Sequence, residues 1–404
     1  MKHANQWILT AAGCAAVMGS LSLPINQVTA DEATTVKSSG IRWSSKMQEL
    51  YKTLADLLTD VSSTKRYFDP VNKTRIESEA THLSALGHDL AKMGGTPSDP
   101  DPTIQIVAGM LRRETKRAAD ELKRGNRAYA RNILRSVPNY CIACHTRNST
   151  GPQFDRLPFE PTSKSLSTEE RGEFFAASRQ FDRAQGEFLK MIQDPQPTNQ
   201  NNWNWEKAVH NSLAIAIRVK NDPLQAQEIV DAVLKTPNAP SFMKEDAKAW
   251  KKSIAEWREE PAHQPMTEEG LYAETLRLMS KARDMQNYPM DRTADVYYLR
   301  ASATVHDLLQ AAPNGVHAED ALLLAGISYE VLSPLKVEDL HEIYYEACIR
   351  RAPHSPTSEL CYRRLEADTV LDYTGSGGTD VPDEVHQRLS ELRGLSQPTI
   401  EIKN

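Results

Sequence analysis

The 404-residue sequence predicts an all-α protein, and three observations carry that prediction. Apolar residues recur over long segments at the i, i+3, i+4, i+7 spacing of amphipathic helices. Glycine and proline concentrate between those segments, and no alternating run of β-branched residues indicates a strand. A stretch rich in proline, serine and threonine divides the helical segments into two groups. The expected organisation is a signal peptide at 1–30, a helical bundle at 31–152, a linker at 153–167 and a helical repeat domain at 168–404.

The first thirty residues have the pattern of a secretory signal peptide. Lys2 supplies a positive charge, residues 7–23 are apolar or small, and residues 28–30 place small side chains at the usual cleavage positions. This pattern predicts an exported, periplasmic protein. The alternative is a lipoprotein anchored through Cys14, although the apolar run before it covers only residues 7–9.

The chain is mildly acidic, with a formal net charge of −6, and contains no basic run. This balance argues against nucleic acid as a partner. No segment after the leader is long and apolar enough to cross a bilayer, so we expect no integral membrane span in the mature protein. The remaining partners are other proteins.

Four amphipathic segments precede residue 152, and each has one apolar face. In chain order, the faces consist of Met47, Leu50, Leu54, Leu57, Leu58 and Val61; Ile76, Ala80, Leu83 and Leu90; Ile104, Val107, Met110, Leu111, Ala118 and Leu122; and Ile133, Leu134 and Val137. Pro138 lies within the fourth segment, where it either kinks the helix or starts a new one. Four such faces are enough to close a helical bundle.

At the end of the fourth segment, Cys141, Cys144 and His145 form the pattern C-x-x-C-H, which attaches haem c. Two thiols three positions apart lie about one helical turn from each other, so both can add to the vinyl groups of one porphyrin. The adjacent imidazole can then bind the iron as its proximal ligand. A thiol–disulfide redox pair would follow a strand, and a zinc site would need a second ligand pair; the sequence indicates neither. We therefore expect one covalently attached haem c.

Four amphipathic helices with this motif near the end of the last resemble the cytochrome c-prime family of four-helix bundles, over residues 41–147. The resemblance implies a haem-bearing bundle and is closest over residues 122–145. That family usually places an aromatic and then a basic residue after the haem histidine; here only Arg147 is comparable, and it is a candidate partner for a haem propionate. Residues 151–152, Gly-Pro, are closer to the small cytochrome c family, whose core helices follow the motif. The helical block before the motif favours the bundle.

The resemblance implies that the other axial position of the iron is either vacant or filled by a methionine of the first helix. Met47 is the candidate distal ligand, although a methionine on an apolar stripe can equally be a core residue. His82, His88, Met93 and Met110 are further candidates, each with less support. A methionine–histidine haem suits electron transfer, whereas an open position can bind a small gas or peroxide.

From residue 168 onward, helical hairpins recur and resemble tetratricopeptide-type repeats. Small and aromatic residues fall at that family's packing positions: Gly172, Phe175, Ala184 and Phe188; Ala214, Ile217, Ala226 and Val230; and Gly326, Tyr329 and Ala347. Residues 268–310 are expected to add a degenerate pair of hairpins. A hairpin cannot bury its apolar face alone, so the resemblance implies stacking into a solenoid-like domain that docks partner proteins.

Cys348 and Cys361 remain, and they are either a disulfide of an exported protein or two buried thiols. The sequence shows no histidine pair at metal-ligand spacing, no phosphate loop and no other catalytic constellation, so we do not expect an enzyme. The expected function is that of an exported monohaem c-type cytochrome, which passes single electrons between redox protein partners. The alternatives are a haem site for a small gas or peroxide, and a scaffold protein whose haem is mainly structural.

Overall fold

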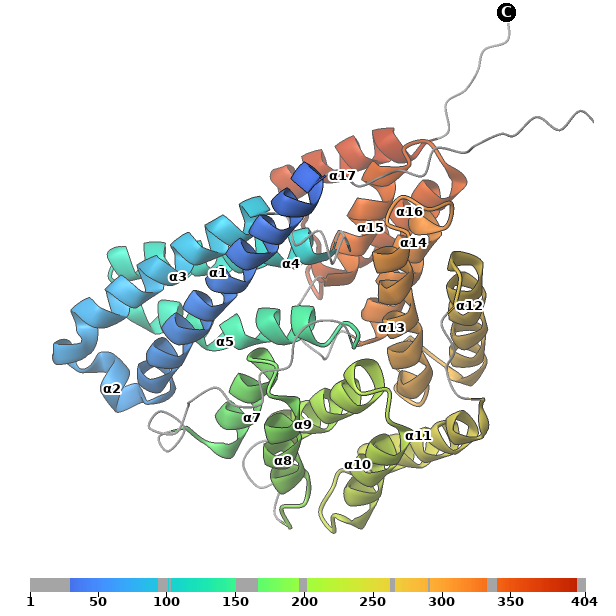
Figure 1. Ribbon diagram of the computed structural model, residues 1–404, viewed down its shortest axis with the longest axis horizontal. Helices are drawn as coiled ribbons and strands as arrows, with labels where there is room; N and C mark the ends of the chain where they lie inside the picture. The colour runs from blue at the N-terminus through green and yellow to red at the C-terminus, as the bar shows by residue number, and fades with distance from the viewer. Residues whose placement is uncertain are drawn as a thin grey trace, which may run out of the picture.

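The computed structural model describes residues 30–93, 101, 103–149, 166–195, 202–261, 266–289, 291–332 and 340–397 (Figure 1). Within this part the protein is all-α, as predicted. The helices are α1 (Ala30–Ser62), α2 (Thr64–Phe68), α3 (Lys73–Met93), α4 (Thr103–Lys123), α5 (Arg127–His145), α7 (Thr168–Ala177), α8 (Phe181–Ile192), α9 (Asn202–Ala214), α10 (Pro223–Lys235), α11 (Ser241–Glu259), α12 (Glu268–Met285), α13 (Asp295–Ala311), α14 (Ala318–Leu332), α15 (Leu340–Arg351), α16 (Pro356–Asp372) and α17 (Asp383–Ser396). The signal-peptide prediction and most of the predicted linker fall outside the described residues.

Helices α1, α3, α4 and α5 pack together at one end of the molecule: α1 contacts α3 and α5, and α4 contacts α3 and α5 (Figure 1). The apolar residues predicted to face inward are buried, except Met47, which is partly buried against the same core. Helices α1 and α5 run antiparallel. Arg131, near the start of α5, donates hydrogen bonds of 2.8 and 3.0 Å to the carbonyl oxygens of Val61 and Ser62 at the end of α1. Helix α5 passes through Pro138 without ending, so no new helix starts there.

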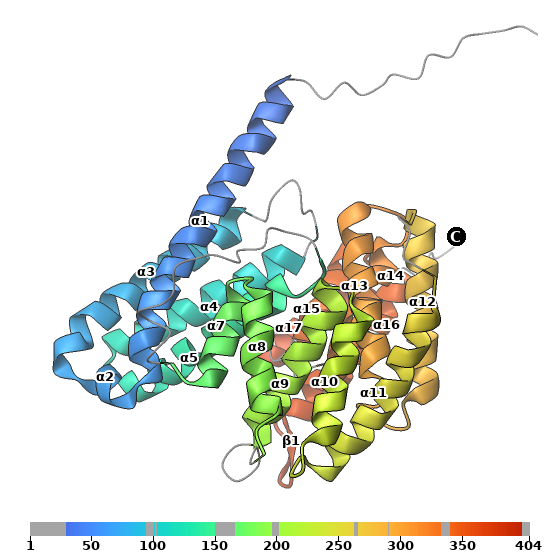
Figure 2. The same cartoon turned by 60° about the horizontal axis from the view of Figure 1, so that its bottom comes forward.

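The helices from α7 onward pack mainly on their neighbours in the chain, and Figure 2 shows α8 to α11 side by side. Two helical pairs use a glycine to approach closely. A Cβ atom on Gly172 of α7 would lie 2.5 Å from Cε1 of Phe188 on α8, and one on Gly326 of α14 would lie 2.3 Å from Cε1 of Tyr345 on α15. Both glycines therefore make room for an aromatic ring of the following helix.

Three local features differ from the sequence-based expectations. Residues 268–310 form one hairpin, α12 and α13, because each helix runs without a break for 18 and 17 residues respectively. Helix α9 ends in a turn of π-helix, η2 (Ile215–Val219), and a 3-10 turn, η1 (Pro70–Asn72), precedes α3. A two-residue antiparallel pair, β1 (Thr374–Gly375) with β2 (Gly378–Thr379), is the only sheet in the described part. Such short elements leave no periodic signal in a sequence.

Cys348 and Cys361 form a disulfide, which joins α15 to α16. Of the two alternatives for these cysteines, the structure therefore has the bridge. Both sulfur atoms lie among buried residues of the C-terminal helices.

None of the helices in the described ranges combines the length and apolar character that a bilayer span requires.

Candidate haem-attachment site

The C-x-x-C-H motif forms the last turn of α5. Cys141 is buried, and its thiol lies 3.7 Å from the carbonyl oxygen of Val137, one turn earlier. Cys144 is partly buried, and both cysteines are unbridged. Their three-residue separation on a continuous helix places both thiols on the same side of the last turn. This is the arrangement that two thioether bonds to one porphyrin require.

The ring of His145 is held by a backbone group from another helix. Its Nδ1 atom lies 2.6 Å from the carbonyl oxygen of Ala177, at the end of α7. A carbonyl oxygen only accepts hydrogen bonds, so Nδ1 carries the proton and Nε2 keeps a free lone pair. Burial, reinforced by the charges of Arg179 and Arg147, lowers the pKa of His145 to about 3. The imidazole is therefore neutral at physiological pH, which is the form that binds a metal.

Three guanidinium groups hold the backbone at and after the motif. Arg147 donates to the carbonyl oxygen of Cys144 at 3.1 Å, and Arg179 donates to that of His145 at 3.2 Å. Arg218, in η2, donates to the carbonyl oxygen of Arg147 at 3.2 Å. Two of the carbonyl groups that α5 leaves unpaired at its end, those of Cys144 and His145, thus accept hydrogen bonds from side chains. These hydrogen bonds hold the backbone of the site in place.

Met47 and His145 hold corresponding positions by residue count along the antiparallel helices α1 and α5. Met47 and His145 are the same number of residues away from the contact between Val61 and Arg131, so each is about 21 Å from it along its helix. One turn beyond Met47, Tyr51 packs against Phe174 of α7 with ring centroids 5.4 Å apart. Phe174 precedes Ala177, the partner of His145, by about one turn of α7. Helix α7 therefore contacts α1 near Met47 and α5 at His145.

The other candidate ligands lie on two helices: His82, His88 and Met93 on α3, and Met110 on α4. His82 and His88 on α3 are exposed, and His82 lies 3.1 Å from the carboxylate of Glu49. Met110 is buried in the core of the helices. Arg147, the candidate partner for a propionate, is itself buried and paired with the carboxylate of Asp101.

The donor set fits haem attachment better than the other chemistries of a C-x-x-C pair. Burial, with a smaller effect of Cys144, raises the pKa of Cys141 to about 12, so its thiol is not the low-pKa nucleophile of a redox pair. In the described part, only Glu342, Asp368 and Asp372 group as a metal-ligand set would, and neither motif cysteine belongs to it. Within the residues that the structure describes, a zinc site at the motif therefore has no second pair of ligands. Two thiols and a neutral imidazole with a free Nε2 suit a covalent haem.

Sequence reasoning missed a buried polar group behind the motif, which we call the Asp101 cluster: Asp101, Arg147, Arg218, His306 and Tyr329. Asp101 lies just before α4, and its carboxylate accepts hydrogen bonds from Arg147 and, at 2.7 Å, from Nδ1 of His306 on α13. Nε2 of His306 lies 2.9 Å from the hydroxyl oxygen of Tyr329 on α14, which Arg218 also contacts. All five residues are buried. No sequence signal could have found them, because they are spread from residue 101 to 329 without a common pattern.

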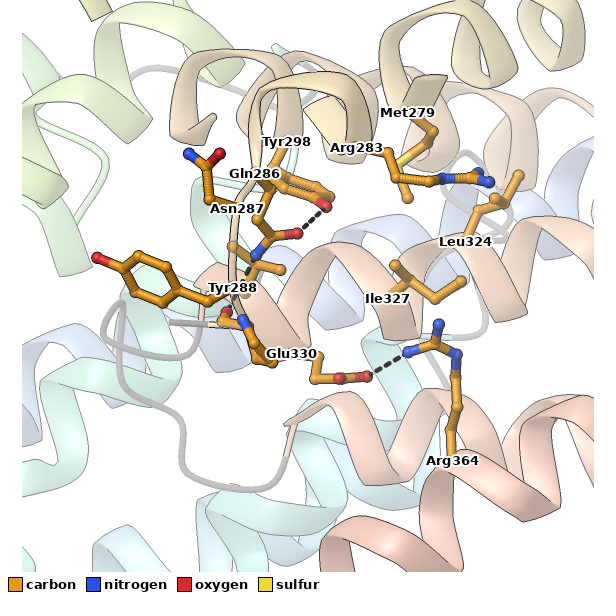
Figure 3. Close-up of a pocket in the computed structure, with 12 residues that line it drawn as sticks. Met279, Arg283, Gln286, Asn287, Tyr288, Tyr298, Leu324, Ile327, Glu330 and Arg364 are labelled. Atoms are coloured by element: carbon orange, nitrogen blue, oxygen red, sulfur yellow. Dashed lines mark hydrogen bonds and ion pairs between the residues drawn. The ribbon is translucent and has the colours of Figure 1, made fainter. Parts of the chain in front are cut away.

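A cavity of about 460 Å³ lies elsewhere, between α12, α13, α14 and α16 (Figure 3). Its wall combines apolar side chains such as Ile327 with two interactions. Glu330 pairs with Arg364 at 3.0 Å, and the hydroxyl of Tyr298 donates to Gln286 at 2.8 Å. None of the predicted site residues lines it.

Comparison of the chain with known protein families, with curated proteins and with solved structures gave no match. The assignment of this site therefore depends on its residues and their geometry.

Proposed function

We propose that this protein is an exported monohaem c-type cytochrome that passes single electrons between redox protein partners. Cys141 and Cys144 would hold the porphyrin, and His145 would bind the iron through Nε2. A haem c bound there supplies the Fe(II)/Fe(III) couple. The proposal needs no catalytic residue, because the protein only has to hold the group, shield it and present it.

The observation that carries the proposal is the hydrogen bond between Nδ1 of His145 and the carbonyl oxygen of Ala177, at 2.6 Å. Histidines that bind metals almost always donate their second ring nitrogen to a carbonyl, a carboxylate or a water, which fixes both tautomer and ring orientation. Here that second interaction is present on a histidine directly after a C-x-x-C pair. An ordinary surface histidine would not need it.

The arrangement of the first helices supports a haem-bearing four-helix bundle like that of the cytochrome c-prime family. Helices α1, α3, α4 and α5 contact one another, and the motif lies at the end of the fourth. The close glycine–aromatic contacts at Gly172 and Gly326 support the resemblance of the C-terminal part to tetratricopeptide-type repeats. In this proposal the repeat-like helices are the docking surface for partners.

The disulfide between Cys348 and Cys361 supports export. Disulfides persist in oxidising compartments such as the periplasm and are rare in the cytosol. The proposed location is therefore the periplasm, with lipid anchoring through Cys14 as the alternative.

Met47 on α1 is as many residues from the contact of Val61 with Arg131 as His145 is on α5. This position supports Met47 as the distal ligand, and hence an electron carrier with a closed coordination shell. If Met47 is only a core residue, the open axial position would favour binding of a small gas or peroxide. A mainly structural haem in a scaffold protein is the third alternative, and a haem whose potential cannot be cycled reversibly would indicate it.

The test is to express the full chain with its leader in a host that attaches haem c. The wild type should carry covalent haem that survives denaturation, and replacing one motif cysteine by serine should shift the α-band of the reduced protein. The double variant C141S/C144S should contain no covalent haem. The matched control is C348S/C361S, which also removes two cysteines but should keep the haem. Covalent haem in C141S/C144S, or none in the wild type, would contradict the proposal.

A further inference from the structure

The Asp101 cluster places two buried cations and one buried anion directly behind the haem motif. Arg147 is 5% exposed, Arg218 3% and Asp101 2%, so water screens these charges little. Burial opposes ionisation of Asp101, but the hydrogen bond from His306 and the charge of Arg147 hold its pKa below the usual range. Asp101 is therefore an anion.

The hydrogen bonds of the cluster run in one direction. Nδ1 of His306 donates to the carboxylate of Asp101, so Nε2 accepts the hydroxyl proton of Tyr329. The oxygen of Tyr329 in turn accepts a hydrogen bond from Arg218. Burial, together with the charges of Arg147 and Arg218, lowers the pKa of His306, although the carboxylate of Asp101 opposes this shift. The guanidinium groups of Arg147 and Arg218 and the carboxylate of Asp101 together carry one net positive charge.

A buried excess charge is costly, and apolar residues of the same volume often stabilise a core more. The cluster is also close to His145. Arg147 follows that histidine by two residues, so their Cα atoms are at most about 7 Å apart. Arg218 contacts the backbone of Arg147, and Asp101 contacts its guanidinium. Asp101 and Arg218 are therefore linked to His145 through Arg147, the second residue after that histidine.

We infer that the Asp101 cluster sets the reduction potential of the haem on α5, through its net charge and through its hold on the residues that follow His145. The inference rests on the proposed haem attachment. Positive charge near the iron favours the ferrous state, which carries one positive charge fewer than the ferric state. The charge is supplied in part by Arg218 and is oriented by α13 and α14, so C-terminal segments control the chemistry of an N-terminal site.

Two substitutions change the charge in opposite directions. Asp101→Asn removes the anion, so the ratio of ferrous to ferric haem at a fixed solution potential should rise about tenfold, for a unit charge near 10 Å at an effective dielectric constant of about 20. Arg218→Gln removes a cation, and the same ratio should fall about tenfold. Arg218→Gln also relieves the excess charge, so it is the variant expected to fold more readily.

The matched control is Asp60→Asn on α1. Asp60 is fully buried and forms ion pairs with Arg66 at 2.9 Å and Arg75 at 2.5 Å, so its loss should also destabilise the protein. It lies beside Val61, which contacts Arg131, and Arg131 is about 21 Å along α5 from His145. A loss of stability should appear in all three variants, whereas the shift in potential should be smaller in D60N than in the cluster variants, because the charge interaction falls with distance.

The measurement is a redox titration of full-length, haem-loaded protein followed by visible absorption, with thermal unfolding in parallel. Opposite shifts for D101N and R218Q, each larger than the shift of D60N, support the inference. Shifts in the same direction, or none, overturn it even when covalent haem is present. If D101N does not fold, R218Q decides alone: a fall supports the inference, and no change or a rise overturns it. Absence of covalent haem in the wild type would remove the proposed function and this inference together.

Discussion

His145 owes its suitability as an iron ligand to a residue that lies 32 positions later in the chain. The sequence identifies the imidazole because Cys141, Cys144 and His145 lie within five consecutive residues, at the spacing that haem attachment requires. It does not identify Ala177, because the group that fixes the tautomer is a backbone carbonyl that any residue would supply. The chemical identity of the site is local, whereas the orientation of its key ring is tertiary.

The role of Met47 is a prediction at the same scale. A thioether ligand stabilises ferrous iron, so Met47→Ala should lower the reduction potential by on the order of 100 mV and open the iron to carbon monoxide. The spectrum and potential of the purified protein, with and without carbon monoxide, are the measurement. Met243→Ala, which removes a buried core methionine of α11, is the control and should change stability alone. A wild type that already binds carbon monoxide freely, with a potential unaffected by Met47→Ala, would leave the gas-binding alternative in its place.

The Asp101 cluster shows where prediction from sequence ends. A charged residue such as Arg147 or Arg218 is read as a solvated side chain unless a partner lies within one or two helical turns. The partners here are 46 residues apart for Arg147 and Asp101, and 205 for His306 and Asp101. Burial and pairing of this kind follow only from the packing of the whole chain.

Helices could be predicted because their signal is local: one apolar face repeats every three or four residues, and almost every predicted inward residue is buried. The glycine–aromatic positions could also be predicted, since Gly172 faces Phe188 in the structure. The number of hairpins between residues 268 and 310 could not be predicted, because an irregular position inside one helix and a turn between two helices interrupt the apolar spacing in the same way. Continuous helices α12 and α13 decide that question.

The close contact of Gly326 with Tyr345 leads to a prediction for one helical pair. In Gly326→Ala the new Cβ would lie 2.3 Å from the tyrosine ring, so the ring or the helix must shift, at a cost of about 1–3 kcal/mol. Gly394→Ala in α17 is the control, because its Cβ would meet no atom within 4 Å. That change should stabilise the protein by about 0.5–1 kcal/mol, since alanine favours helix. Free energies of unfolding from urea titrations measure both; equal stabilisation by the two would show that the close contact is unimportant.

The two predicted domains share buried contacts at the scale of the whole molecule. Three hydrogen bonds link the last turn of α5 and its surroundings to the C-terminal helices: His145 to Ala177, Asp101 to His306, and Asn148 to Asp307 at 3.0 Å. Each involves at least one group shielded from water. The predicted linker at 153–167 is therefore compatible with one continuous interior. Its composition separates two helical parts in the sequence, but it does not tell whether these parts pack against each other.

This interior predicts how the protein responds to limited proteolysis. We expect cleavage within residues 153–167, because their composition, rich in proline, serine and threonine, is typical of a linker between two helical parts. The two fragments should separate on a denaturing gel, with haem on the N-terminal one, yet elute together from a sizing column under native conditions. His306→Phe keeps an aromatic side chain but removes the hydrogen bonds of the ring to Asp101, Tyr329 and Tyr344. These groups lose a partner, so the haem-bearing fragment should be released at a lower urea concentration than in the wild type. Phe242→Ala, at a half-exposed position on α11, is the control and should leave that concentration unchanged. Fragments of the wild type that part without denaturant would show that the contacts between α5 and the C-terminal helices are too weak to join the two parts, and that the linker alone holds them together.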